Sequence, residues 1–175
     1  TWDGTASSSG THMYVNGFEV TYASQSRGSG ARISDASWNV SLGALHGGAQ
    51  TFYGKIDETR IYNRVLTADE ASRLYRTTAP TGVDTGLKGY WSFDGDDISG
   101  TTATDLSGAG NHGTLTNGPT KTIGKMGQAL NFNGTNQYAE VPHQSYLNSY
   151  PLTVSAWFKT SGSSNGSIVN KYPGG

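Results

Sequence analysis

Two neighbouring acidic residues, Asp57 and Glu58, offer the first candidate for catalytic chemistry. They lie within residues 56–65, where apolar and polar residues alternate as they do in a long β-strand. Glycoside hydrolysis with retention needs two carboxyl groups about 5–5.5 Å apart that face the substrate together. Neighbouring strand residues point to opposite faces, and residue 55, which would share a face with Asp57, is a lysine. The sequence therefore disfavours a hydrolase that uses a carboxylate pair.

Asp57 has two other interpretations, as a calcium ligand or as the ion-pair partner of Arg60 or Arg64. Calcium binds about 6–8 oxygen atoms from carboxylates, amides and carbonyls. The loop from Asp105 to Asn111 offers two such side chains and several carbonyls beside glycines. We therefore take Asp57, Asp105 and Asn111 as candidate ligands of structural calcium. The alternative for the loop is an Asx turn satisfied by its own backbone.

The other reactive side chains form no catalytic or metal motif. His12, His46, His112 and His143 are scattered without the spacing of metal ligands. The serines lie in no nucleophile elbow, and the glycine-rich stretches lack the Lys-Ser/Thr ending of a phosphate-binding loop. Cysteine is absent, which rules out disulfides and thiolate metal sites.

The aromatic residues divide into a predicted core and a predicted ligand-binding set. Alternation within strands predicts a core that includes Trp91, Phe93, Phe132, Trp157, Ile56 and Ile61. Tyr22, Trp38 and Tyr172 lie near loops, where their rings can stack on the apolar faces of sugars. The alternative for these three is plain packing at the rim of the core.

Composition favours an antiparallel all-β protein. The 175 residues include 25 Gly, 10 Tyr, 5 Phe and 4 Trp, a mixture typical of many strands joined by turns. The formal net charge is −1 and no basic patch is present, so nucleic acid and anionic membranes are not expected partners. We expect no membrane span, because no apolar run is long enough to cross a bilayer.

Local patterns predict the strands and one helix. Asn16-Gly17, flanked by alternating residues, predicts a hairpin with a type I′ turn, and residues 133–136 predict a second hairpin between strands at 129–132 and 138–141. Further strands are expected at residues 38–43, 90–93, 152–159 and 167–170. Thr67 and Glu70 form a capping box that begins a helix of about two turns. Residues 79–87 resemble a linker between segments 1–78 and 88–175.

The segment after the linker resembles the first half of a laminin-G-like domain of the concanavalin A-like lectin and glucanase superfamily, of the bacterial type related to pentraxins. The matching motifs are Tyr90-Trp91-Ser92-Phe93-Asp94, the loop from Asp105 to Gly113, residues 127–134, residues 138–142 and the strand at 152–158. The segment before the linker resembles the second half of such a domain, through residues 1–4, 14–17 and 54–66. The two halves therefore stand in permuted order.

This resemblance implies an antiparallel β-sandwich, a concanavalin A-like jelly roll with one short helix. The family's central strands, roughly 40 residues at about 10 per strand and turn, have no counterpart between Gly175 and Thr1. We therefore expect that the chain is a piece of a tandem array. Its two halves either close together as one sandwich or complete the sandwiches of neighbouring chains. Unpaired sheet edges recruit other strands, so self-association is expected.

The resemblance also implies a function. The leading hypothesis is a non-catalytic, extracellular or cell-surface module of a repetitive protein, which binds carbohydrate or another surface ligand. A structural or filament subunit is the alternative, and a glucanase or lyase of the same superfamily is disfavoured. Members often hold calcium near a loop like the one after Asp105. A ligand-bridging calcium pair is not expected, because residues 42–48 contain no carboxylate.

Overall fold

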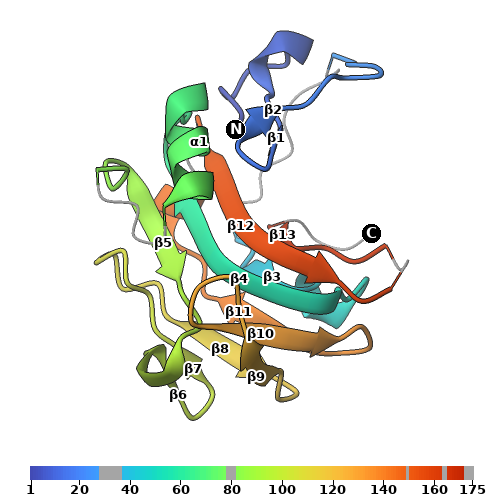
Figure 1. Ribbon diagram of the computed structural model, residues 1–175, viewed down its shortest axis with the longest axis vertical. Helices are drawn as coiled ribbons and strands as arrows, with labels where there is room; N and C mark the ends of the chain where they lie inside the picture. The colour runs from blue at the N-terminus through green and yellow to red at the C-terminus, as the bar shows by residue number, and fades with distance from the viewer. Residues whose placement is uncertain (28–36, 78–81, 149, 163–164, 172–175) are drawn as a thin grey trace.

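Two antiparallel sheets form a β-sandwich in the computed structural model, which describes residues 1–27, 37–77, 82–148, 150–162 and 165–171 (Figure 1). One sheet contains β12 (Thr153–Thr160), β4 (Tyr53–Tyr62), β10 (Gln128–Asn133) and β9 (Thr120–Ile123), and β5 (Leu87–Trp91) also pairs with β4. The other runs in the order β13 (Val169–Asn170), β3 (Val40–Leu42), β11 (Tyr138–Val141), β8 (Gly113–Thr116), β7 (Thr102–Ala103) and β6 (Ile98–Ser99). The predicted all-β sandwich is confirmed.

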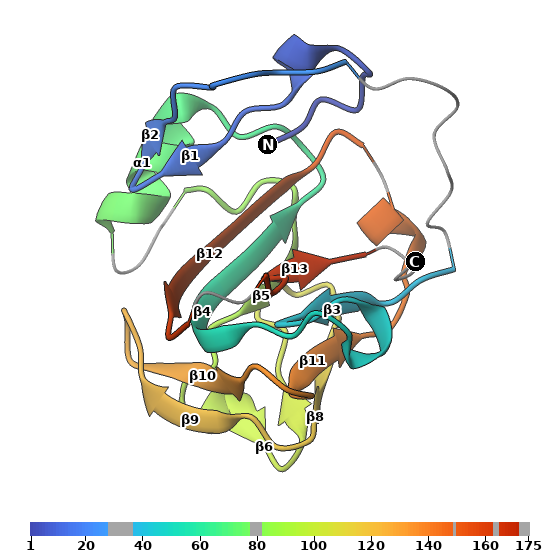
Figure 2. The same cartoon turned by 90° about the vertical axis from the view of Figure 1, so that its right-hand side faces the viewer.

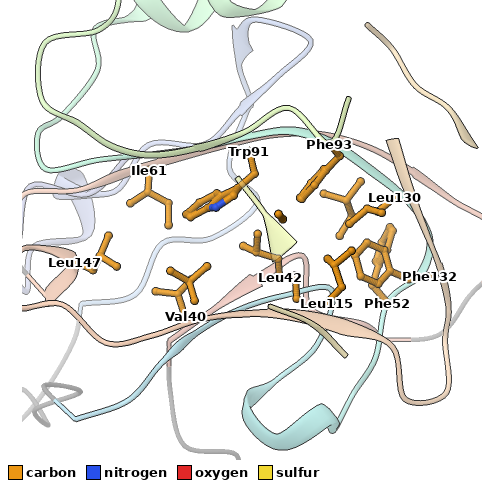
Figure 3. Close-up of a cluster of buried hydrophobic side chains, with 14 residues drawn as sticks. Val40, Leu42, Phe52, Ile61, Trp91, Phe93, Leu115, Leu130, Phe132 and Leu147 are labelled. Atoms are coloured by element: carbon orange, nitrogen blue, oxygen red, sulfur yellow. The ribbon is translucent and has the colours of Figure 1, made fainter. Parts of the chain in front are cut away.

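Apolar side chains from both sheets meet in one core, shown in Figure 3. Its members are Val40, Leu42, Phe52, Ile56, Ile61, Trp91, Phe93, Ala103, Leu115, Leu130, Phe132, Ala139, Val141 and Leu147. The core predictions for Ile56, Ile61, Trp91, Phe93 and Phe132 are confirmed. The prediction for Trp157 is wrong, because this side chain is only half-buried and lies outside the cluster.

Strand β4 joins the segments on the two sides of the predicted linker. Along one edge it pairs with β12, and along the other it pairs first with β10 and then with β5. Ile56 and Ile61 both reach the core although they are five residues apart, because the alternation of the strand shifts at Glu58, whose φ is 53°. The boundaries at residues 79–87 stay a prediction, although Leu87 already belongs to β5.

The one α-helix in the described residues forms where the capping box predicts it. Helix α1 spans Ala68–Arg76, the Thr67 side chain accepts the Glu70 amide, and the Glu70 side chain accepts the Thr67 amide. The Arg64 guanidinium donates to both Glu70 carboxylate oxygens, at 2.6 and 2.8 Å. A second apolar cluster of Tyr62, Leu66, Leu74 and Val83 holds the helix against the end of β4.

One predicted hairpin is confirmed and the other is wrong. Strands β1 (Tyr14–Val15) and β2 (Phe18–Glu19) pair around Asn16 and Gly17, whose φ angles of 53° and 79° fit a type I′ turn. Strands β10 and β11 do not pair with each other, because they belong to opposite sheets. Each directs apolar residues into the core, and residues 133–136 carry the chain across the sandwich.

The remaining described elements are short 3₁₀ helices. They are η1 (Ser8–Gly10), η2 (His46–Gly48), η3 (Gly95–Asp97) and η4 (Ser145–Asn148). In the described part of the chain, no helix is long and apolar enough to cross a membrane.

The shared core predicts that both segments unfold together. Leu42→Ala removes a fully buried side chain that comes from before the linker, and should lower the free energy of unfolding by about 2–5 kcal/mol. Tryptophan fluorescence and far-UV circular dichroism should give one coincident transition in urea. Ile123→Ala, at a side chain that is 82% exposed, should change stability by less than about 0.5 kcal/mol. Two separate transitions would contradict a shared core.

Candidate functional site

A groove of about 760 Å³ lies between β12 and the β1–β2 hairpin. Figure 2 shows how these two elements are arranged. Residues 11–17 line one side, residues 152–158 line the other, and α1 and β13 contribute Tyr75 and Val169. Five of the ten exposed large hydrophobic side chains in the described residues lie here, namely Met13, Val15, Tyr75, Val154 and Phe158. Apolar surface is therefore concentrated at this groove.

Aromatic rings from distant segments meet in the groove. The Tyr75 ring of α1 lies 5.3 Å from the Trp157 ring of β12, with the planes tilted by 30°. The Lys125 ammonium lies 4.6 Å from the centre of the Trp157 ring. At the other end, the Trp2 ring meets Tyr150 edge-on at 4.5 Å. These rings offer flat apolar surface beside polar groups.

Of the residues predicted to stack on sugars, Tyr22 and Trp38 do not line this groove. The Tyr22 hydroxyl accepts the Met13 amide at 2.8 Å and donates to Glu19 at 2.9 Å, so it holds the hairpin. The Trp38 ring lies edge-on to His46 at 4.8 Å, beside β3. Tyr172 lies outside the described residues. Sugar binding by Tyr22, Trp38 and Tyr172 stays a prediction.

No motif in the sequence predicts that Trp2, Tyr75 and Trp157 line one groove. They come from the first residues, the helix and β12, and no local motif links positions so far apart. A signal was nevertheless present, because Tyr75 follows Leu74 near the end of a short amphipathic helix. A helix of that length cannot bury two adjacent large side chains on one face, so one of them faces another element.

Asp57 is buried and organises the turn before β10. Its Oδ2 atom accepts the amides of Lys125 and Met126 at 2.7 and 3.1 Å, while Oδ1 is buried without a hydrogen-bond partner among the described groups. Burial raises the pKa of Asp57 to about 6; the two amides oppose this rise, and the carboxylates of Glu58 and Asp94 add to it. The surroundings of the Asp57 carboxyl group are therefore rich in negative charge.

Glu58 belongs to a separate buried cluster. Its carboxylate accepts hydrogen bonds from Arg60 at 2.5 Å and from the Tyr90 hydroxyl at 2.9 Å, and the Arg60 guanidinium lies 4.0 Å above the Tyr90 ring. Burial raises the pKa of Glu58, and the nearby Arg60 opposes this rise. Burial also raises the pKa of the Tyr90 hydroxyl.

The predicted ion pair between Asp57 and Arg60 or Arg64 is wrong. Arg60 pairs with Glu58, and Arg64 pairs with Glu70. At the irregularity of β4 where Glu58 has a φ of 53°, the Glu58 carboxylate contacts the Arg60 guanidinium, whereas the Asp57 carboxylate binds the amides of Lys125 and Met126. Neither Asp57 nor Glu58 lines the groove.

The loop after β7 uses Asp105 to hold its own backbone. Its Oδ1 atom accepts the amides of Tyr90 and Ser107, and its Oδ2 atom accepts the Asn111 amide and the Ser107 hydroxyl. The Asn111 side chain donates to the Lys88 carbonyl and accepts the Tyr146 hydroxyl. These contacts match the Asx-turn alternative, and calcium ligation by Asp105 and Asn111 stays a prediction.

Of the three candidate calcium ligands, only Asp57 has a buried side-chain oxygen without a hydrogen-bond partner in the described residues, and calcium ligation by Asp57 stays a prediction. Asp57 Oδ1 and Gln128 Oε1 are both buried without a donor in the described residues, and Asp94 binds the backbone of the same turn through Gln128. Two carboxylates and an amide are hard oxygen ligands of the kind calcium prefers. No cluster of three or more His, Cys, Asp or Glu residues with metal-binding geometry occurs in the described chain.

Comparison with known proteins supports the resemblance seen in the sequence. Residues 1–72 match the family model described as the concanavalin A-like lectin/glucanases superfamily. This match confirms the resemblance over those residues and agrees with the antiparallel sandwich. No curated protein and no solved structure matches the chain.

Calcium binding beside Asp57 predicts a metal-dependent gain in stability. A ligand at about 100 times its Kd adds about 2.7 kcal/mol, which corresponds to roughly 5–10 °C for a protein of this size. Calcium should therefore raise the unfolding midpoint relative to protein in EDTA, and Asp57→Asn should abolish the difference. Asp105→Asn, in the loop, should leave the difference intact. Equal midpoints of the unchanged protein in calcium and EDTA would contradict this expectation.

Proposed function

From the superfamily match of residues 1–72, we propose that the protein is a non-catalytic laminin-G-like module that binds carbohydrate or another surface ligand outside the cell. The observation that carries this proposal is the groove along β12. Its volume of about 760 Å³ lies within the range of small-molecule sites, and its walls combine aromatic rings with polar groups.

The chemistry of the groove suits a sugar. The rings of Tyr75 and Trp157 present apolar faces, on which the C–H groups of a pyranose pack. His12 and Ser155 line the same groove and offer hydrogen-bonding groups for hydroxyls. A sugar unit against the aromatic pair would therefore have both kinds of contact that carbohydrate recognition needs.

The placement of the acidic residues supports a non-catalytic role. The described lining of the groove includes neither Asp nor Glu. Glu58 is engaged with Arg60 and Tyr90, and Asp57 binds the turn before β10. A glucanase or lyase would need such groups beside the bound substrate, in reach of the reacting atoms.

Glycan binding at the groove should depend on the aromatic pair. Trp157→Ala should weaken binding of any glycan found in an array screen by at least about tenfold, because stacked rings contribute on the order of 1.5 kcal/mol beyond their buried area. Titration calorimetry measures the change. Trp38→Ala is the matched control and should bind like the unchanged protein. Loss of binding in Trp38→Ala with retention in Trp157→Ala would place the site beside β3 instead.

A second candidate function is self-assembly, favoured by the open edges of both sheets. Strands β12 and β13 each end their sheet on the side of the groove, and Phe158 is 57% exposed there. Exposed strand edges beside apolar side chains recruit strands from other molecules.

Self-assembly predicts a mass that rises with concentration. Light scattering should give values above the 18.5 kDa of one chain, and Phe158→Lys should return the mass to one chain by adding charge at the edge. Leu106→Lys, at a side chain that is 42% exposed in the loop after β7 and away from the strand edges, serves as the control. A single-chain mass at every concentration would exclude self-assembly.

A further inference from the structure

Two lysines face each other across β4 and β12 on the outer face of the five-stranded sheet. Lys55 and Lys159 are register partners, and Ile56, the next residue of β4, points into the core on the other face. The Cβ atoms of direct cross-strand partners lie about 4.5–5.5 Å apart, and like charges at this spacing destabilise a sheet. In the described part of the chain, no carboxylate forms an ion pair with either lysine. Two positive charges are therefore held together without an opposite charge to offset them.

A third ammonium group lies beside this pair. The Lys125 Nζ atom is 4.6 Å from the centre of the Trp157 ring. Trp157 and Lys159 lie two residues apart on the same face of β12, which separates their Cα atoms by about 7 Å. The buried Asp57 carboxylate holds the turn that carries Lys125, because it accepts the Lys125 backbone amide at 2.7 Å. We call the cluster of Lys55, Lys125 and Lys159 the basic patch.

The accessible groups around the basic patch carry no negative charge. Asp57 and Glu58 come next along β4, but they are only 3% and 2% exposed, and Glu58 is engaged in an ion pair. On the other side of Lys55, its register partner is Asn131, which in turn pairs with Thr120 of β9. This part of the sheet therefore combines positive charge with amide and hydroxyl groups.

An exposed tyrosine ring lies at one end of the basic patch. Tyr53 precedes Lys55 by two residues on the same face of β4, and the residue is 44% exposed. Gly134 and Gly162 flank its side chain, because a Cβ atom at these positions would lie 2.6 and 2.8 Å from Tyr53 atoms. Along β4, the distance from Tyr53 to the level of Trp157 is about 14 Å. The ring and the three cations therefore extend over more than one unit of a bound chain.

The basic patch lies on the face of the sheet and not at its edge. Figure 1 shows β12, β4 and β10 side by side, and the patch spans the first two of these strands. Strands add to a sheet in its plane, so any further strand along β12 would leave this face accessible. Helix α1 packs at the Tyr62 end of β4, whereas Tyr53 and Lys55 lie at the other end.

We propose that the basic patch binds an acidic polysaccharide, whose carboxylate or sulfate groups contact the three lysines while a sugar ring stacks on Tyr53. The bound anions offset the repulsion between Lys55 and Lys159, and the neighbouring amide and hydroxyl groups meet sugar hydroxyls. This proposal rests on the proposed glycan-binding function and names its ligand class. The basic patch is continuous with the groove, because Trp157 lines the groove and supports Lys125.

Nucleic acid and anionic membranes fit the basic patch less well. Both are dense polyanions that attract a broad basic surface, whereas this chain has a net charge of −1. The three positive charges are surrounded by neutral polar groups, which match the hydroxyls between the acidic groups of a polysaccharide. The lysines come from positions far apart in the sequence and meet only when β4, β12 and the turn before β10 fold together.

Oligosaccharides of equal length and different charge test the proposal. The acidic probes are an alginate oligomer, which carries carboxylates, and a heparin oligomer, which carries sulfates; a cellulose oligomer is the neutral control. In titration calorimetry, at least one acidic probe should bind at least about tenfold more tightly than the neutral oligomer, and added NaCl should weaken this binding. Equal binding of acidic and neutral oligomers would overturn the proposal, as would tighter binding of an oligothymidylate with the same number of charges.

Charge-removing variants locate the site. The double variant Lys55→Gln, Lys159→Gln should weaken binding of the acidic probe by at least about tenfold, because two ammonium groups are lost. It should also unfold at an equal or higher urea concentration, since the repulsion between the strands is removed. Lys88→Gln removes the same charge from β5 and is the matched control, which should bind normally. Normal binding by the double variant, or an equal loss in Lys88→Gln, would overturn the proposal.

The outcomes separate this inference from the proposed function. Binding of a neutral glycan that depends on Trp157, together with no binding of either acidic probe, would overturn the basic patch and leave the binding module standing. Binding of an acidic probe that is weakened in both Lys159→Gln and Trp157→Ala supports both, because Trp157 holds Lys125 in place. Absence of binding to all of the oligosaccharides and to a glycan array would overturn both.

Discussion

The pairing of β4 on both edges is the constraint on which the rest of the structure depends. Along one edge this strand meets β12, and along the other it meets β10 and β5, so it carries contacts between segments far apart in sequence. The register between β12 and β4 shifts between Ser155 and Trp157. The opposing segment of β4 contains Glu58, whose φ of 53° is consistent with a β-bulge. Gly54 has no room for a Cβ atom, which would lie 2.2 Å from the Lys159 carbonyl oxygen. The close approach of β12 to β4 therefore requires glycine at position 54.

Local features of the fold were predictable because their causes are local. The turn at Asn16–Gly17 follows from residues that accept positive φ, and α1 follows from the reciprocal hydrogen bonds of Thr67 and Glu70. Which strands pair with each other was harder to predict from the sequence. Residues 133–136 have the composition of a hairpin turn, yet the flanking strands separate into opposite sheets, since both bury apolar residues from opposite sides of one core. The residue types of a turn alone therefore do not distinguish a hairpin from a connection between opposite sheets.

The candidate site shows the same division between local and long-range information. The loop after Asp105 could be interpreted from its own residues, and its contacts match the Asx-turn alternative. The groove could not be predicted, because Trp2, Tyr75 and Trp157 line it only when three distant segments fold together. Trp157 was assigned to the core since it alternates with apolar residues in a strand. That alternation does not tell which face of an edge strand is covered by the second sheet.

The pairing of β12 with β4 is the central feature of the structure, and residue-resolved hydrogen exchange tests it most directly. If the two strands pair in the described register, the amides of Ser155, Trp157 and Lys159, which face β4, are protected from exchange. The amides of successive residues in one strand point in opposite directions, so these three face the same edge. Rapid exchange at all three positions would contradict the pairing.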